Sequence, residues 1–131
     1  APRVIAYDVA LLMQDNRVLL RQRTETLLQG LWVFPLVEGS KTPAQLSKAL
    51  LRALGLTCTY ERPLEKARHI FTHQVWEMQL HLLACTGEAP AGCRFVTAEE
   101  ISALPLPTAM RRAKAQALTL LNSKGEQHAT E

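Results

Sequence analysis

The chain of 131 residues carries a net charge of +3, and 47% of its residues are hydrophobic against 21% that are charged. This balance is ordinary for one soluble globular domain that is large enough to bury a core. No apolar run approaches the roughly 20 residues of a membrane helix, and the first residues lack the pattern of a secretory signal. The mild positive charge permits a nucleic-acid partner without requiring one.

The chain has three cysteines, and no two of them have Cys-x-x-Cys spacing. An odd count argues against a disulfide framework, so a reducing compartment is expected.

Sequence patterns predict a β-hairpin at the start of the chain, with a buried strand over 3–13, a turn over 14–16 and a second strand over 17–23. A loop over 24–31 and a short extended piece over 32–34 follow.

The next segment has clear signals for a helix. Thr42 is the predicted N-cap, Pro43 occupies the first helical position, and Gln45 completes a capping box. Gly55 is expected to end the helix in the left-handed conformation. The apolar residues that recur at helical spacing and form one apolar face are Leu46, Ala49, Leu50, Ala53 and Leu54.

The second half of the chain begins with strands over 56–62 and 64–70. The segment 74–84 alternates between apolar and polar residues, which predicts a half-buried antiparallel strand. The apolar positions are Trp76, Met78, Leu80 and Leu82, and the polar ones are Glu77, Gln79 and His81. His81 has no metal-ligand partner in the sequence, and no role is assigned to it.

The last elements are a short strand over 94–96, a brief helix that starts at a capping box of Thr97 and Glu100, and a final helix over 108–121. This order indicates an α+β fold with a mixed sheet between helices. We expect one domain over residues 1–121 and a disordered polar tail over 122–131.

Two stretches resemble the Nudix fold. The first is Leu28–Pro35, preceded by Leu19–Arg23, which is similar to the entry of that fold, and the second is the helix that closes with Gly55 and Leu56. The resemblance implies an α/β/α sandwich around a mixed, largely antiparallel sheet. With the Nudix motif in register on Gly55, its metal-binding glutamates fall on non-acidic residues, namely Ser40, Ala49, Arg52 and Ala53.

The loss of these carboxylates bears on activity. Mg²⁺ prefers hard oxygen ligands, which alanine and arginine do not offer. Glu38, in the loop before the helix, is one carboxylate and does not replace a cluster. We therefore predict no catalytic and no metal-binding residue in this chain.

A further resemblance is to the C-terminal lesion-recognition domains of A/G-specific adenine DNA glycosylases. It rests on the segment 69–73, on the alternating strand that follows it and on the segment 104–112, together with the vacant Nudix motif. Members of this family have a Phe-Ser-His turn, and this chain has Thr72 in place of the serine. The resemblance implies a domain that reads 8-oxoguanine opposite adenine in base excision repair.

The resemblance assigns Phe71, Thr72 and His73 to lesion and DNA contact. Phe71 would wedge or stack near the base, or only plug the core. The Thr72 hydroxyl would accept a hydrogen bond from N7–H of the lesion, donate one to O8, or do both. His73 would contact phosphate or brace the turn.

Basic residues near this turn have two interpretations. Lys66, Arg68 and His69 would line a phosphate track, or form a solvated strand face. The cluster of Arg111, Arg112 and Lys114 on the last helix would touch DNA or another domain, or be a solvated helix face. Arg21 and Arg23 would be structural residues or weak DNA contacts.

The resemblance further implies that the chain, which begins with Ala1, is the C-terminal fragment of a longer bacterial glycosylase. The expected partners are duplex DNA containing 8-oxoguanine opposite adenine and the N-terminal catalytic domain of the same protein. The resemblance places a 4Fe–4S iron–sulfur cluster in that other domain, and we expect no cofactor in this chain. We expect the protein in the cytoplasm, associated with the nucleoid through DNA. The alternatives are a Nudix hydrolase with a relocated metal site and a non-catalytic nucleotide-sensing or interaction domain.

Overall fold

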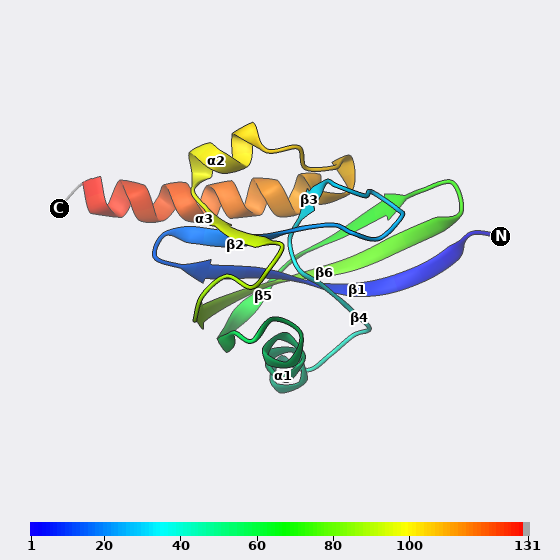
Figure 1. Cartoon of the computed structure of the whole chain (residues 1–131), viewed down its shortest axis with the longest axis horizontal. Coiled ribbons are helices and arrows are strands. Elements are labelled where there is room, and N and C mark those ends of the chain that lie inside the picture. Colours follow the sequence, from blue (N-terminus) through cyan, green and yellow to red (C-terminus); the bar gives the residue numbers. More distant parts are fainter. Residues whose placement is uncertain (130–131) are drawn as a thin grey trace.

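The computed structural model describes residues 1–129, with side chains up to Ser123. The elements in chain order are β1 (Arg3–Gln14), β2 (Arg17–Gln22), β3 (Trp32–Val33), β4 (Leu36–Glu38), α1 (Pro43–Leu54), β5 (Thr57–Ile70), β6 (Gln74–Thr86), β7 (Cys93–Val96), α2 (Ala98–Ala103), a 3₁₀ turn (Thr108–Met110) and α3 (Arg111–Ala129). All strands belong to one sheet, which separates α1 from α2 and α3 (Figure 1).

Strand β1 is the centre of the sheet. It runs parallel to β6 over its whole length, and β6 pairs antiparallel with β5 at one edge. On the other side of β1, β4 pairs with its middle residues and β2 with its last residues, while β3 and β7 both pair with β2. The prediction of an α/β/α sandwich around a mixed sheet is confirmed.

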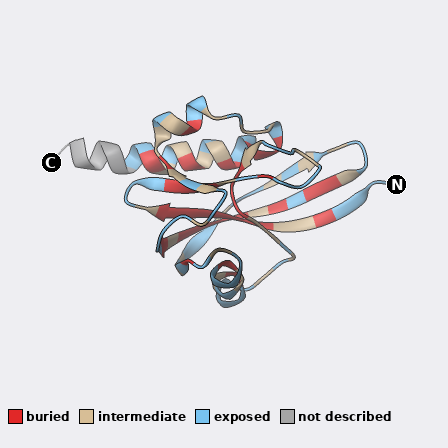
Figure 2. Cartoon of the chain, in the orientation of Figure 1, coloured by how far each residue is buried: buried red, intermediate tan, exposed pale blue. Residues whose placement is uncertain are grey.

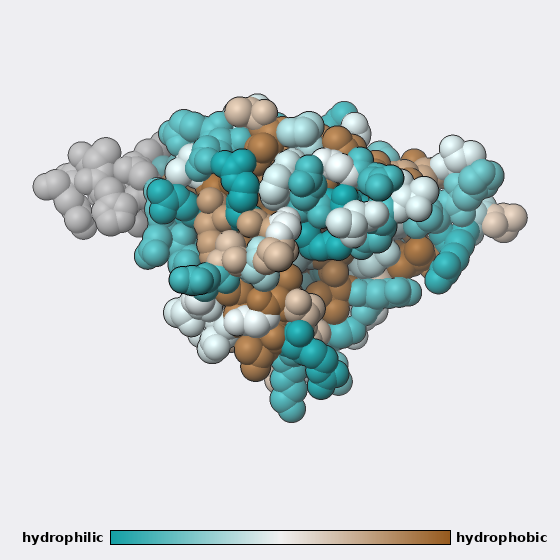
Figure 3. All heavy atoms as spheres, in the orientation of Figure 1, coloured by the Kyte–Doolittle hydropathy of each residue, from teal (hydrophilic) through white to brown (hydrophobic). Residues whose placement is uncertain are grey.

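Each face of the sheet packs against its own helical layer. On one face, Leu46 and Leu50 of α1 pack with sheet residues such as Leu12, Leu19 and Leu83. On the other face, the 3₁₀ turn and α3 cover a second cluster, whose members include Val9, Leu11, Leu80, Met110, Ala113 and Ala117. Near the right-hand end of the view, buried residues alternate with intermediate and exposed ones along the strands (Figure 2). Hydrophilic side chains cover the outer tip of α1, and hydrophobic ones show between the layers (Figure 3).

The local signals in the sequence are realised in the structure. The Gln45 N–H donates to the Thr42 hydroxyl over 3.2 Å, and the Thr42 N–H donates to the Gln45 side chain over 3.0 Å. Gly55 has φ 70° and its N–H donates to the Leu51 carbonyl. Asp15 and Asn16 both have positive φ, as a tight hairpin turn between β1 and β2 requires.

Three predictions about strands need correction. The segments 56–62 and 64–70 form one strand, β5, because irregular pairing near Pro63 lets the strand continue past it. The three-residue strand β4 was not predicted. Finally, β6 is antiparallel only to β5, and its residues 80–83 are buried on both faces because β1 and both helical layers enclose them.

The final helix differs from the prediction at both ends. A 3₁₀ turn occupies 108–110, and α3 continues beyond Leu121 to Ala129, which corrects the predicted helix end. The remainder of the predicted disordered tail, residues 130–131, lies outside the described residues. None of the described helices is both long enough and apolar enough to cross a membrane.

Candidate nucleic-acid interface

The turn between β5 and β6 is a two-residue hairpin loop. The Phe71 N–H donates to the Gln74 carbonyl over 2.8 Å, which leaves Thr72 and His73 as the exposed tip. The Arg3 N–H at the start of β1 donates to the His73 carbonyl over 3.1 Å. The tip is therefore supported by three strands, and it projects at the end of the sheet beside the N-terminus (Figure 1).

The backbone at the tip is ordinary. The non-glycine residues with positive φ among those described are Asp15, Asn16 and Leu28, so neither Thr72 nor His73 adopts the left-handed conformation. A β-branched residue would be strained there. Thr72 therefore presents an exposed hydroxyl without backbone strain at the position where the family has serine.

Phe71 is packed from both sides by aromatic rings. Its ring centroid lies 4.5 Å from that of His69 and 4.8 Å from that of Trp76, both in edge-on geometry. Trp76 is buried and lies 5.1 Å from Tyr7. Phe71 is thus anchored on the apolar cluster under α3, as the interpretation of a core plug predicts, although its ring is still partly exposed.

Arg23 also supports this cluster. Its guanidinium lies 5.4 Å from the centre of the Trp76 ring, and its Nε donates to the Leu27 carbonyl over 2.8 Å. Only 8% of its surface is exposed. These contacts favour the structural interpretation of Arg23, because a nearly buried guanidinium that is already bonded has little left to offer a phosphate.

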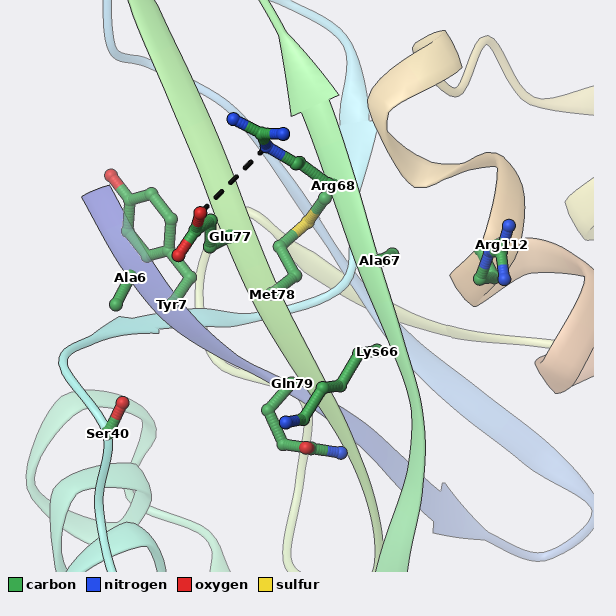
Figure 4. A pocket seen from close by; sticks show the side chains of 10 residues that line it. All are labelled: Ala6, Tyr7, Ser40, Lys66, Ala67, Arg68, Glu77, Met78, Gln79 and Arg112. Carbon is green, nitrogen blue, oxygen red and sulfur yellow. Dashed lines mark ion pairs between the residues drawn. The ribbon is translucent and has the colours of Figure 1, made fainter. Parts of the chain in front are cut away.

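Lys66 and Arg68 lie on one face of β5, while His69 lies on the other. Lys66 and Arg68 line a shallow pocket of about 560 Å³ together with Gln79 and Glu77 of the neighbouring strand (Figure 4). Arg68 Nε is 3.9 Å from Glu77 Oε1, a long and exposed ion pair. Lys66 and His69 therefore line different pockets, because their side chains point to opposite faces of the strand, while Arg68 lines both pockets.

A second pocket, of about 390 Å³, lies between β5 and the start of α3. Its basic residues are Arg68, His69, Arg111 and Arg112. Arg112 Nη1 is 3.3 Å from Glu65 Oε2 at its rim. The structure thus brings His69 together with Arg111 and Arg112 of the last helix, but not with Lys114, a combination that the sequence did not indicate.

The helix that would carry the Nudix carboxylates has none of them. Ala49, Arg52 and Ala53 lie on one exposed or partly exposed side of α1, and Ser40 is at the rim of the 560 Å³ pocket. Among the described residues, no group of three or more His, Cys, Asp or Glu side chains could hold a metal ion. The donor set at the former Nudix position therefore does not fit a divalent metal.

The thiols do not fit an iron–sulfur cluster either. The sequence has three cysteines, whereas a 4Fe–4S cluster takes four thiolates. Cys58 and Cys85 face each other across β5 and β6, and burial raises the pKa of the Cys85 thiol to about 11. A thiol that stays protonated at neutral pH is a poor ligand and a poor nucleophile.

Sequence reasoning missed a buried polar network under α1. His81 Nε2 lies 2.8 Å from Asp8 Oδ1, and His81 Nδ1 lies 2.8 Å from the Tyr60 hydroxyl. The other oxygen of Asp8 accepts the Lys41 N–H over 2.9 Å. Asp8 interrupts the apolar run of the first strand, which was a signal for a buried and bonded carboxylate.

Comparisons with known proteins agree with this architecture. Residues 8–116 match the NUDIX domain family. Adenine DNA glycosylase of Homo sapiens is 35% identical over 107 residues, which is 73% of this chain and 20% of that protein. The Mus musculus protein is 36% identical over 108 residues, with 72% of this chain and 20% of that protein covered. The chain thus spans about a fifth of the length of the curated relatives it matches.

Solved structures with a similar fold include a glycosylase domain and a Nudix protein. The C-terminal domain of mouse MUTYH, in its complex with human PCNA, superposes with a TM-score of 0.68 at 25% identity, covering 94% of this chain and 90% of that one. The MutT protein from Methanosarcina mazei Go1 superposes with a TM-score of 0.72 at 14% identity, covering 95% and 96%. This second likeness concerns the fold alone.

Proposed function

The chain belongs to the NUDIX domain family and is homologous to the C-terminal Nudix-like domain of adenine DNA glycosylases, and from this premise we propose that it is the lesion-recognition domain of such an enzyme. Its role would be to read 8-oxoguanine opposite adenine in duplex DNA. The remainder of the enzyme would remove the adenine and carry the 4Fe–4S cluster. The proposed location is the bacterial cytoplasm, with association to the nucleoid through DNA.

The observation that carries this proposal is the exposed Thr72 hydroxyl at the tip of a supported hairpin. Guanine presents an acceptor at N7 in the major groove, whereas 8-oxoguanine presents a donor there and an additional acceptor at O8. A hydroxyl both accepts and donates, so one side chain can satisfy both groups of the lesion. Opposite guanine, only its donor finds a partner, and the preference follows from that difference.

The neighbours of Thr72 support this role. The aromatic contacts of Phe71 and the backbone bond from Arg3 to His73 fix the tip, so little conformational entropy is lost when DNA binds. Lys66 and Arg68, on one face of β5, would contact the phosphate backbone beside the tip. His73 is exposed and would lie against the same DNA.

This site does not support the hydrolysis of a pyrophosphate, which is the reaction of Nudix hydrolases. The positions that hold metal in a Nudix hydrolase carry Ala49, Arg52 and Ala53, and a cation at position 52 would repel Mg²⁺. Adenine removal requires a flipped base in a pocket with acid groups. The pocket next to the hairpin carries three basic side chains and the single carboxylate of Glu77, which forms an ion pair with Arg68, so recognition without cleavage is the function proposed for this chain.

The test is a titration of labelled duplexes that contain 8-oxoguanine:A, G:A or G:C, at low salt, with the wild-type chain, Thr72→Val and Thr72→Ser. We expect the wild type and Thr72→Ser to prefer the lesion duplex. Thr72→Val keeps the shape but removes the hydroxyl, so the preference should fall by roughly two- to tenfold, the value of one hydrogen bond.

The matched control is Thr59→Val, which makes the same change at an exposed position in the opposite half of β5. It should leave all three affinities unchanged. Equal binding of the three duplexes by the wild type would contradict the proposal. A preference that survives in Thr72→Val would show that another group reads the lesion.

A further inference from the structure

The pocket between β5 and α3 lies directly beside the hairpin that is proposed to read the lesion. His69 lines this pocket, and its ring also contacts the Phe71 ring that anchors the tip. Since a strand rises about 3.3 Å per residue, His69 is roughly 10 Å from Thr72 along the chain. The pocket and the tip are thus close enough to touch one DNA duplex together.

The charge of this pocket is strongly positive. Three guanidinium groups and one imidazole line it, against the single carboxylate of Glu65. That carboxylate pairs with Arg112, and no carboxylate among the described side chains pairs with Arg111. The first turn of α3 contains no acidic residue that would oppose an anion. Thr108, at the wall of the pocket, adds a neutral hydroxyl.

The placement of cations on both faces of one hairpin matches the geometry of a DNA groove. Lys66 lines the pocket on the α1 face of β5, whereas His69 and Arg111 line the pocket on the α3 face, and Arg68 lines both. The major groove is about 12 Å wide and admits a two-stranded β-ribbon, with one phosphate backbone on each side. A ribbon whose tip meets a base edge therefore needs cations on both of its faces.

We infer that the pocket between β5 and α3 binds a backbone phosphate of duplex DNA through His69 and Arg111, with Arg68 at its edge, while Lys66 on the other face of β5 contacts the second phosphate strand. The inference rests on the proposed DNA-binding function and extends it to the last helix. Phosphate contacts position a protein without reading sequence. Arg111 therefore sets affinity and orientation, while Thr72 sets the choice of base.

The experiment measures the dissociation constant of the chain for the 8-oxoguanine:A and G:C duplexes over a range of salt concentrations. Arg111→Gln should weaken binding to both duplexes by the same factor, about two- to fivefold, as expected for an exposed ion pair. The slope of log affinity against log salt should become less negative by roughly one, because one phosphate contact is lost. The ratio between the two duplexes should not change.

Two further variants make the result decisive. Arg52→Gln removes the same charge from the exposed side of α1, outside the pocket, and should leave affinity and slope close to the wild-type values. Glu65→Gln frees Arg112 from its ion pair and should strengthen binding to both duplexes. If Arg111→Gln binds as Arg52→Gln does, or if Glu65→Gln has no effect, the pocket is not a phosphate site.

Failure of this inference can be distinguished from failure of the proposed function. If the wild type shows no preference for the lesion duplex but Arg111→Gln still reduces affinity and salt slope, lesion reading is wrong and the phosphate site stands. If the preference is present and Arg111→Gln matches Arg52→Gln, lesion reading stands and only the phosphate site is overturned.

Discussion

Beneath α1 the polar groups of the sheet are buried and bonded to one another, whereas at the β5–β6 hairpin they are exposed and directed outward. Asp8 and His81 are 2% and 6% exposed, and both oxygens of Asp8 already have partners within the protein. Thr72 and His73 are exposed, and the ion pairs of the nearby Arg68 and Arg112, at 3.9 Å and 3.3 Å, are exposed as well. The two regions belong to the same strands, since β6 carries both His81 and the end of the hairpin.

This difference indicates that the α1 region stabilises the fold, whereas the hairpin is available for binding. In the α1 region, bonded polar groups and apolar packing determine whether the domain folds, and the carboxylates that would bind metal are absent. At the hairpin, exposed groups add little to stability and remain available to a ligand. Substitutions in the α1 region should therefore change stability but not lesion preference, and substitutions at the tip should do the reverse.

The largest expected effect is that of Asp8→Ala. The substitution leaves the His81 imidazole and the Lys41 N–H without their acceptor in a buried site. We expect the free energy of unfolding to fall by about 3–5 kcal/mol, as when one member of a buried pair is removed. Urea denaturation followed by circular dichroism measures this change. Asp8→Asn, which keeps one acceptor oxygen, should lose less.

The control is Glu38→Ala, an exposed carboxylate on β4 close to the same loop, which should change stability by less than about 0.5 kcal/mol. The folded fraction of Asp8→Ala should still prefer the lesion duplex. A stability loss below about 1 kcal/mol would show that the network under α1 is not important for folding. Loss of lesion preference in the folded variant would break the proposed separation of the two regions.

A smaller effect is expected from Thr42→Ala at the start of α1. The change removes the side chain that accepts the Gln45 N–H, so the free energy of unfolding should fall by about 0.5–2 kcal/mol. Thr42→Ser keeps the hydroxyl and should remain close to the wild type. The measurement is thermal or urea unfolding of the three proteins, and an equal loss in Thr42→Ser would mean that the methyl group matters more than the cap.

Local features were predictable from the sequence, whereas features built from distant residues were not. Both capping boxes and the β1–β2 turn depend on residues within four positions of each other, and the structure confirms them. The parallel pairing of β1 with β6, by contrast, joins residues such as Asp8 and Gln79, which nothing in the local pattern connects. Strand β4 is a strand only because it pairs with β1.

The candidate site divides in the same way. The turn at Thr72 was predicted as a turn, and its resemblance to a known family identified it. The basic pocket was missed because Arg111 and His69 are far apart in the sequence and meet only after α3 packs beside β5. The separation of His69 from Lys66 was, however, predictable from the two-residue period of a strand.

The smallest expected effect concerns Glu25, an exposed residue in the loop after β2. Burial alone would raise the pKa of this carboxyl, but hydrogen bonds from Arg21 and from the backbone hold it at about 2, below the ordinary value of 4.5. A lowered folded pKa stabilises the folded state above pH 4.5, and this contribution is lost as the pH falls towards 2. Because the pair is about half exposed, we expect less than about 1 kcal/mol.

Arg21→Gln should raise the pKa of Glu25 towards its ordinary value, which carboxyl-carbon NMR detects directly. It should also reduce the small loss of stability between pH 5 and pH 2. A wild-type Glu25 that titrates near 4.5 would show that the ion pair does not persist in solution. In that case exposed ion pairs of this domain, including the one between Arg112 and Glu65, would be weak competitors for a DNA phosphate, and Arg112 would join Arg111 as a free cation beside the hairpin.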